Sequence, residues 1–179
     1  MTYSKIYLSI PKERIGTLLG ERGEIKEAIE KLLNVKISVS SKGNDAGSII
    51  IEGGFNSSSI LKARDIITAI GYGLNPHNAL KLAEDDYIVL FVNIGDQAPA
   101  ARNLKRIKGR IIGENGKSKR NIEELTKTFI VVDDISNTVV IMGKYENAML
   151  ARDAIIKLIN GAEHGSVYRF IKRKAHILM

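Results

Sequence analysis

Cysteine is absent from the 179 residues, which excludes a disulfide framework, a thiolate zinc site and a cysteine nucleophile. Long apolar runs are absent as well, since no stretch reaches the roughly 18 apolar residues that a transmembrane helix needs. The first residues, MTYSKI, lack the apolar stretch of a signal peptide. We therefore expect a soluble, cytoplasmic protein.

Recognisable catalytic constellations are also missing from the sequence. His77, His164 and His176 lie far apart, and none belongs to an HExxH motif, so no zinc site is indicated. The pairs Asp85-Asp86 and Asp133-Asp134 fit a strand start and a turn, whereas a two-metal site needs several carboxylates brought together. We expect no catalytic residue, no metal and no cofactor.

Basic residues are in excess, and they are unevenly distributed. The 27 Lys and Arg outnumber the 20 Asp and Glu, which gives a net charge of +7 and a sequence pI near 9.5. Residues 1–85 contain 11 basic and 10 acidic side chains, whereas residues 86–179 contain 16 and 10. A basic protein favours a polyanionic partner such as nucleic acid. The second half of the chain carries nearly all of the excess.

An internal repeat relates the two halves at a constant offset of 93 residues. The segment GERGEIKEAIE at 20–30 aligns with GENGKSKRNIE at 113–123, and the similarity continues for about ten residues beyond. Besides the glycines, the coinciding pairs are Lys26 and Lys119, Ile29 and Ile122, Glu30 and Glu123, Leu32 and Leu125, Ile37 and Ile130, and Val39 and Val132. A match of this length indicates two copies of one module.

Each copy shows the same order of elements, β-α-α-β-β-α, which predicts an α+β fold. Apolar periodicity and turn residues predict, in the first copy, strands over 4–10, 35–40 and 48–52, and helices over 11–20, 24–34 and from about 57. In the second copy they predict strands over 87–94, 128–132 and 138–142, and helices over 103–112, 117–127 and 145–160. Each module should be a three-stranded sheet covered by three helices.

The break between the modules is predicted after the third helix, where the sequence reads GYGLNP at 71–76. We assign residues 1–75 to the first domain, 76–86 to a linker that can hold a turn or two of helix, and 87–179 to the second domain. The second domain ends in a basic extension with interleaved aromatics. Within it, Phe170 and Ile171 indicate that one face packs on the module.

A Gly-x-x-Gly loop joins two helices in each copy, at Gly20-Glu21-Arg22-Gly23 and at Gly113-Glu114-Asn115-Gly116. Glycine accepts positive φ and has no Cβ, so a nucleic-acid backbone can approach the peptide itself. The turn also directs the N-terminus of the next helix outward, and that end favours phosphate. Such a loop beside an apolar trough binds about four unpaired nucleotides.

With these motifs in both copies, the chain resembles type I KH proteins, and more narrowly the ribosome-assembly family called Partner of Nob One. The second resemblance is carried by RIIGENGKSK at 110–119, IEELTKTFIVV at 122–132, Gly143, Ala151-Arg152 and SVY at 166–168. An intact Gly-x-x-Gly in both modules implies an archaeal member. The resemblance implies binding of single-stranded 16S rRNA near its 3′ end, the 3′-end maturation endonuclease and the alpha subunit of translation initiation factor two as partners, and a monomer.

The charge around the two loops predicts that the second module dominates RNA affinity. Glu21 and Glu24 flank Arg22 in the first loop, whereas basic residues surround Glu114 in the second. We predict RNA contacts in the second module from Lys108, Arg110, Ile111, Ile112, Gly113, Glu114, Asn115, Gly116, Lys117, Lys119 and Arg120. Weaker contacts are predicted in the first module from Gly20, Glu21, Arg22, Gly23 and Lys26. The first module could instead contact a protein.

One departure from the KH pattern concerns the lining of the trough. Many KH modules carry an aliphatic residue three places after the second glycine, where this sequence has Lys26 and Lys119. Arg110 and Lys119 are candidates for direct RNA contact, and Phe129 is a candidate for the floor of the trough. Ile130 fits a core position better.

Two further functions remain open at the level of sequence. An adaptor that presents RNA to a decay complex belongs to the same binding class, and copurification with either pre-small-subunit particles or exosome subunits separates the two. A metal-dependent ribonuclease belongs to another class and would cleave labelled RNA in the presence of Mg²⁺.

Overall fold

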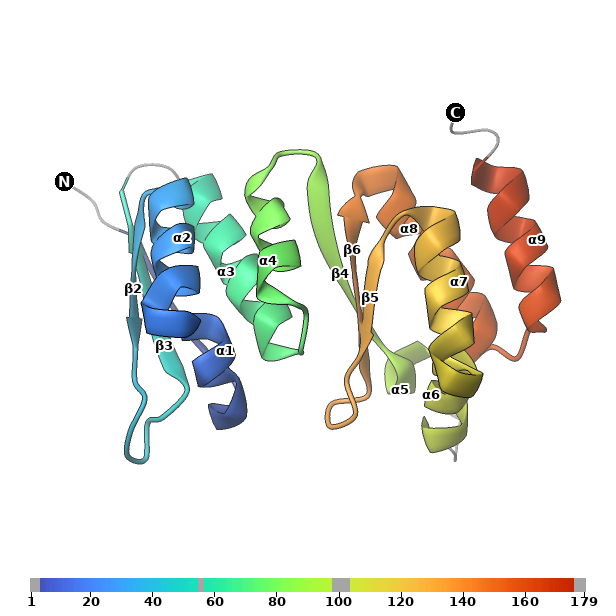
Figure 1. The fold of residues 1–179 in the computed structure, drawn as a ribbon, viewed down its shortest axis with the longest axis horizontal. Coiled ribbons are helices and arrows are strands. Elements are labelled where there is room, and N and C mark those ends of the chain that lie inside the picture. Colours follow the sequence, from blue (N-terminus) through green and yellow to red (C-terminus); the bar gives the residue numbers. More distant parts are fainter. Residues whose placement is uncertain (1–3, 55–56, 98–103, 176–179) are drawn as a thin grey trace. The chain divides into compact units, whose positions relative to one another are not determined.

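In the computed structural model, which describes residues 4–54, 57–97 and 104–175, the chain divides into two units between Asp85 and Asp86. The first unit (Figure 1) contains β1 (Ser4–Ser9), η1 (Lys12–Arg14), α1 (Ile15–Leu19), η2 (Glu21–Gly23), α2 (Glu24–Leu33), β2 (Val35–Val39), β3 (Ser48–Gly53), α3 (Ser57–Gly71), α4 (Pro76–Ala79) and η3 (Leu80–Ala83), where η marks a 3-10 helix.

The second unit repeats this order with additions. It contains β4 (Tyr87–Asn93), α5 (Ile94–Gln97), α6 (Leu104–Ile112), η4 (Glu114–Gly116), α7 (Lys117–Thr126), β5 (Phe129–Val132), β6 (Thr138–Lys144), α8 (Tyr145–Ile159) and α9 (His164–Ala175). The predicted order of elements is confirmed in both copies. The predicted start of the helix at residue 103 lies outside the described residues.

Each unit holds a three-stranded antiparallel sheet in which the last strand of the three is central. The orders are β1-β3-β2 and β4-β6-β5. Strand β2 alternates between buried and exposed residues, with Ile37 inward and Lys36 and Ser38 outward, so helices cover one face of the sheet. The predicted pair of α+β modules is confirmed.

The helix after each loop ends in the same way. Asn34 after α2 and Lys127 after α7 both adopt the left-handed conformation, with φ of 51° and 54°. Asparagine tolerates this conformation, and the sequence predicts the first ending for that reason. Lysine carries no such signal, yet Lys127 ends α7 in the same way, and both helices end one residue before the predicted boundaries, at Leu33 and Thr126.

The segment 76–86, assigned to a linker from the sequence, contains α4 and η3, and both pack against α3 of the first unit. The side chain of Asn75 accepts hydrogen bonds from the N–H groups of His77 and Asn78, which caps α4, and Leu82 is buried. Up to Asp85, the structure therefore groups this segment with the first unit.

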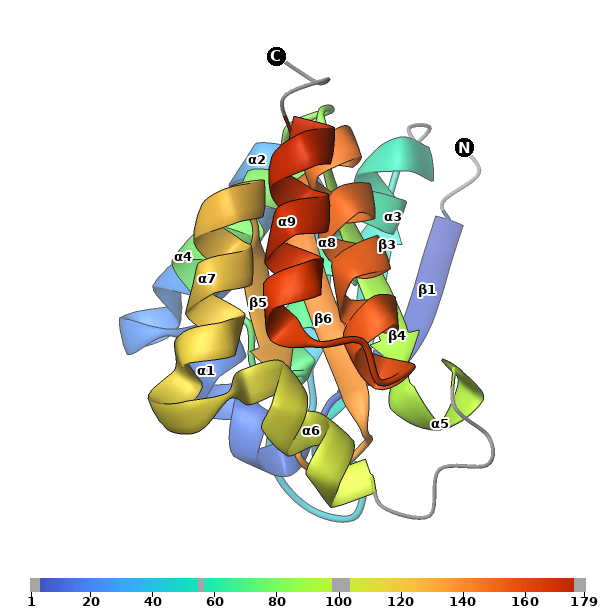
Figure 2. The same cartoon turned by 90° about the vertical axis from the view of Figure 1, so that its right-hand side faces the viewer.

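The basic extension forms α9, which packs against α7 and α8 (Figure 2). Val167 and Ile171 lie one helical turn apart and are fully buried in the core of the second unit, while Phe170 is partly buried. The prediction that one face of this segment packs on the second module is confirmed. The opposite face displays Arg169, Lys172 and Arg173 as exposed side chains.

Candidate nucleic-acid interface

The two Gly-x-x-Gly loops have the same backbone conformation. Gly113 and Gly20 both have φ of 74°, with ψ of 174° and −177°, a region open only to glycine. The third residue of each loop, Asn115 or Arg22, is left-handed, and so is the last glycine, with φ of 76° at Gly116 and 87° at Gly23. The repeat in sequence therefore produces a repeat in local structure.

The two glycines of each loop serve different needs. A Cβ on Gly113 would lie 2.6 Å from the Cβ and 2.7 Å from the backbone nitrogen of Ser118, and one on Gly20 would lie 2.6 Å from Ile25. The first glycine therefore lets the loop pack on the following helix. At Gly23 no described atom lies within 4 Å of an added Cβ, and at Gly116 the guanidinium of Arg120 comes within 3.1 Å. The second glycine therefore faces open space in the first module and is bordered by the Arg120 side chain in the second.

The two loops have the same backbone conformation but differ in the charge of the exposed side chains around them. Glu114 and Asn115 are exposed in the second loop, and Lys117 and Arg120 follow as exposed side chains on α7. At the offset of 93, the first unit places Glu24 and Glu27 at these two helix positions, also exposed. The N-terminal turn of α7 is therefore basic and that of α2 acidic.

Three basic residues that the sequence predicts as RNA contacts are bonded within the second unit. Lys108 is only 8% exposed, and its ammonium group donates to the carbonyl of Asp134. Arg110 donates through Nη2 to the carbonyl of Ala162 at 2.6 Å, and Lys119 donates to Glu123 and Ile130. RNA contact by these three residues stays a prediction, and Lys117 and Arg120 are the more accessible cations.

A reciprocal pair of hydrogen bonds joins the end of α6 to the corner between α8 and α9. The side chain of Arg110 reaches the carbonyl of Ala162, while Nε2 of His164 donates to the carbonyl of Arg110 at 2.8 Å. His164 therefore satisfies a carbonyl in the last turn of α6, directly before the loop. The Nε atom of Arg110 is buried and has no hydrogen-bond partner among the described residues.

The apolar residues that the sequence predicts near the RNA fall into two groups, buried core residues and partly buried residues. Ile111 and Ile130 are buried, with exposures of 0% and 1%, so both belong to the core of the second unit. The interpretation of Ile130 as a core residue is confirmed. Ile112, next to Gly113, and Phe129 are only partly buried and remain the apolar groups nearer to solvent.

A lysine–glutamate pair on the second helix, which sequence reasoning did not recognise as a structural unit, contacts the neighbouring edge strand in both modules. Glu123 accepts from the backbone N–H of Ile130 at 2.7 Å, and Glu30 accepts from that of Ile37 at 2.7 Å. Lys119 and Lys26 form ion pairs with these glutamates at 2.9 and 3.0 Å. The available signal was the repeated Lys-x-x-x-Glu spacing, which places the two side chains on one helix face.

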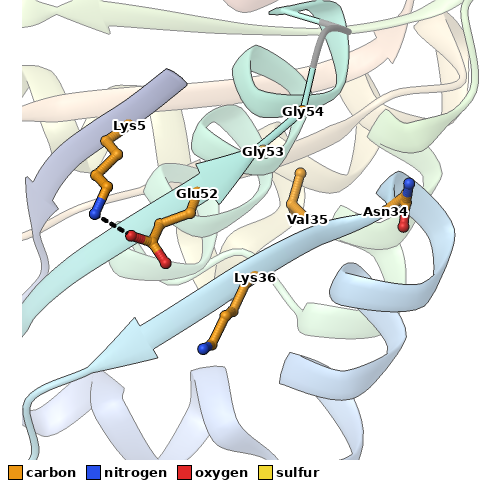
Figure 3. Close-up of a pocket in the computed structure, with 7 residues that line it drawn as sticks. All are labelled: Lys5, Asn34, Val35, Lys36, Glu52, Gly53 and Gly54. Atoms are coloured by element: carbon orange, nitrogen blue, oxygen red, sulfur yellow. Dashed lines mark ion pairs between the residues drawn. The ribbon is translucent and has the colours of Figure 1, made fainter. Parts of the chain in front are cut away.

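One hollow of the first unit lies away from its Gly-x-x-Gly loop. It has a volume of about 640 Å³ and is lined by Lys5, Asn34, Val35, Lys36, Glu52, Gly53 and Gly54 (Figure 3). Asn34 ends α2, whereas the loop begins it, so this hollow lies at the far end of the helix. Lys5 forms an ion pair with Glu52, and its hydrogen bond and charge lower the pKa of the Glu52 carboxyl group. The hollow is a feature of the sheet rather than of the loop.

The acidic pairs have structural partners. Asp85 and Asp86 form ion pairs with Lys62 and Lys144, and Asp133 accepts from the N–H and hydroxyl of Ser136 at 2.7 and 2.6 Å. Partial burial raises the pKa of Asp133, but the hydrogen bonds from Ser136 outweigh it and hold that pKa below its ordinary value. Across residues 4–54, 57–97 and 104–175, no three acidic or histidine side chains gather as a metal site would require.

Two antiparallel sheets of order 1-3-2, each with a Gly-x-x-Gly turn between its first two helices, define a tandem KH protein of type I. A KH-domain family model matches residues 5–69, and a model of the second KH domain of PNO1, described as a eukaryotic type KH-domain (KH-domain type I), matches residues 91–176.

Similar proteins and structures show to which family of KH proteins the chain belongs. A KH domain-containing protein of Methanocaldococcus jannaschii is 41% identical over 170 residues, which cover 93% of this chain and 72% of the relative. The RNA-binding protein pno1 of Dictyostelium discoideum is 33% identical, with 90% and 67% covered. The solved structure of Dim2p from Pyrococcus horikoshii superposes with a TM-score of 0.84 at 35% identity and covers 95% of this chain and 99% of that one. The chain belongs to the PNO1/Dim2 family of KH proteins.

No helix among the described residues combines the length and the apolar character needed to cross a membrane.

Proposed function

We propose that this chain is a non-enzymatic, cytoplasmic factor that binds single-stranded 16S rRNA near its 3′ end during small-subunit assembly and pre-rRNA processing. The observation that carries the proposal is the loop Gly113–Gly116, whose left-handed turn exposes Glu114 and Asn115 beside the basic first turn of α7. A relative from Aspergillus oryzae is named a pre-rRNA-processing protein, and a similar solved structure from Pyrococcus horikoshii is a complex of Dim2p with rRNA and the alpha subunit of initiation factor two.

The loop binds RNA through its backbone. Because Gly116 precedes α7, the first N–H groups of that helix point toward the loop, and they have no partner within the helix. These donors and the positive end of the helix dipole favour a phosphate oxygen. Lys117 and Arg120 add positive charge within the same turn, so successive phosphates of a flexible strand are held there.

The first module has the same loop without this charge, so its role is positioning or a protein contact. Glu24 and Glu27 replace the two cations on the helix that follows the loop. We assign the initiation-factor subunit and the 3′-end endonuclease as partners of the whole chain, and the first module is the candidate for one of these contacts. RNA affinity then comes mainly from the second module.

The experiment that tests the function uses a labelled single-stranded RNA with the 3′-terminal sequence of 16S rRNA. Fluorescence anisotropy at low salt should show stoichiometric binding by the full chain, and a duplex of the same sequence should bind more weakly. Incubation of the complex with Mg²⁺ should leave the RNA intact on a denaturing gel. Absence of binding would overturn the proposal, and cleavage that follows the protein through purification would overturn its non-enzymatic part.

A further inference from the structure

In both units, the backbone N–H of one isoleucine on an edge strand donates to a glutamate of the neighbouring helix. In the second unit, Glu123 accepts from the N–H of Ile130 at 2.7 Å, and Lys119 donates to the carbonyl of the same residue at 3.0 Å. The two side chains also pair with each other at 2.9 Å. The Lys119–Glu123 ion pair thus forms hydrogen bonds with both the backbone N–H and the backbone carbonyl of Ile130.

The position of Ile130 makes this contact relevant to RNA. Strand β5 is at the edge of its sheet, with β6 on one side only. The N–H and carbonyl of Ile130 point away from β6, since both bond to side chains of α7. Helices α6 and α7, which carry the Gly-x-x-Gly loop between them, pack against β5. Bases of a strand whose phosphates lie on the loop would meet this edge.

The backbone groups at an unpaired strand edge can recognise a base by hydrogen bonding. An edge residue offers one donor and one acceptor, and an unstacked base presents the complementary donor and acceptor on its Watson–Crick edge. Paired hydrogen bonds of this kind discriminate between bases by roughly tenfold or more. At Ile130 the N–H already donates to Glu123 and the carbonyl already accepts from Lys119, so a base cannot form the paired hydrogen bonds there unless the ion pair opens.

The first module has a matching ion pair on α2 beside its own edge strand, so the glutamate contact to that strand is repeated in this chain. Glu30 accepts from the N–H of Ile37 at 2.7 Å, and Lys26 pairs with Glu30 at 3.0 Å. The side chains of both pairs are mostly shielded, with exposures of 27% and 22% for Lys26 and Glu30 and of 30% and 21% for Lys119 and Glu123. Shielding reduces competition from water for these bonds.

We propose that the Lys119–Glu123 pair blocks base readout at Ile130 on the edge of β5, so that the second module holds RNA through its phosphates and discriminates weakly at the nucleotide beside Ile130. Lys119 on α7 then determines specificity through its bond to Ile130 of β5, rather than by contacting a phosphate. This inference rests on the proposed function, because it concerns how the same surface treats the bound strand.

The test asks whether opening the ion pair gives the protein a base preference that the wild type does not have. The full chain is titrated against a panel of labelled eight-nucleotide RNAs in which each position is varied in turn through the four bases. The proteins are the wild type, Lys119→Met/Glu123→Ala, and the matched control Lys26→Met/Glu30→Ala, which opens the corresponding edge of the first module. Hydrogen exchange at the Ile130 amide, followed by NMR, confirms that the edge has opened.

The Lys119→Met/Glu123→Ala protein should gain discrimination of about tenfold or more at one position, which neither the wild type nor the control shows. If the double variant does not fold, Lys119→Met alone frees the carbonyl and should show a smaller preference at the same position. If the folded double variant has a fast-exchanging Ile130 amide but the same base preference as the wild type, the inference is wrong while the proposed function stands. The inference is also wrong if the wild type already has a base preference at this position and the variant loses it. A wild-type protein that binds no RNA of the panel overturns the proposed function.

Discussion

The two modules of this chain share a backbone and differ in charge. Gly20–Gly23 and Gly113–Gly116 adopt the same left-handed turns, and the helix that follows each ends in a left-handed residue. At the two exposed helix positions after the loop, however, one module has Glu24 and Glu27 and the other has Lys117 and Arg120. The comparison teaches that the glycines create a phosphate-compatible turn, while the flanking side chains decide whether a phosphate is attracted to it.

The largest effect is expected when the second module is given the charges of the first. Lys117→Glu/Arg120→Glu should weaken RNA binding by at least about 100-fold at low salt, since two cations beside the phosphates become anions. The slope of log affinity against log salt should fall by about 1.4, because each phosphate that is no longer neutralised removes about 0.7. Anisotropy titrations at several salt concentrations measure both quantities. An unchanged slope would show that these side chains do not contact phosphate.

A smaller effect, of opposite sign, is expected from the reverse exchange. Glu24→Lys/Glu27→Arg should strengthen binding to an RNA long enough for both modules by about tenfold and steepen the salt slope by up to about 1.4. The physical reason is that the first loop already has the required backbone. The same titrations apply, with an oligonucleotide too short to reach both modules as the control. No gain with the long RNA would mean that the first loop is unavailable to the strand.

The second module also has a corner between α8 and α9 that supports its loop, and this contact predicts a moderate effect on stability. His164→Ala removes the hydrogen bond to the carbonyl of Arg110 and should lower the stability of the second module by about 1 kcal/mol. RNA affinity should fall a few-fold through the loop, and the salt slope should stay that of the wild type because the same phosphates are neutralised. Thermal unfolding and the salt series measure these changes. A reduced slope would place His164 in contact with RNA.

The smallest effect concerns the turn between β5 and β6. Asp133 has a pKa below its ordinary value, so its contribution to stability is present above the unfolded-state pKa of about 3.9 and is lost as the pH falls through the folded-state pKa. Ser136→Ala removes the hydroxyl donor and should move the Asp133 pKa upward, which NMR titration of the carboxyl carbon measures. The loss of stability at neutral pH should be below about 1 kcal/mol. An unshifted titration would contradict the assigned cause.

The element order and the core could be predicted because they depend on local patterns. Apolar spacing places Ile29 and Ile122 inward, and the glycine pairs require turns whatever surrounds them. The segment 76–86 was harder to assign, because four-residue helices such as α4 depend on packing against α3 rather than on a long periodic pattern. The short α5 gives no pattern for the same reason.

The candidate site was predictable in its loop and less so in its side chains. Gly113 to Gly116 follow from sequence alone, since their conformation is local. The partners of Lys108 and Arg110 are carbonyls 26 and 52 residues further along the chain, and no sequence spacing reveals such contacts. Lys119 was interpreted as a candidate RNA contact because its ion pair with Glu123 and its bond to Ile130 become visible only when α7 lies beside β5.

The central claim, that the second loop carries most of the RNA affinity, is tested most directly by placing two aspartates in each loop in turn and measuring binding of the same labelled RNA. Glu114→Asp/Asn115→Asp adds one negative charge and should weaken binding by about 30-fold or more, whereas Glu21→Asp/Arg22→Asp shifts the charge by two and should change it by less than about threefold. A larger loss from the change in the first loop would contradict the account.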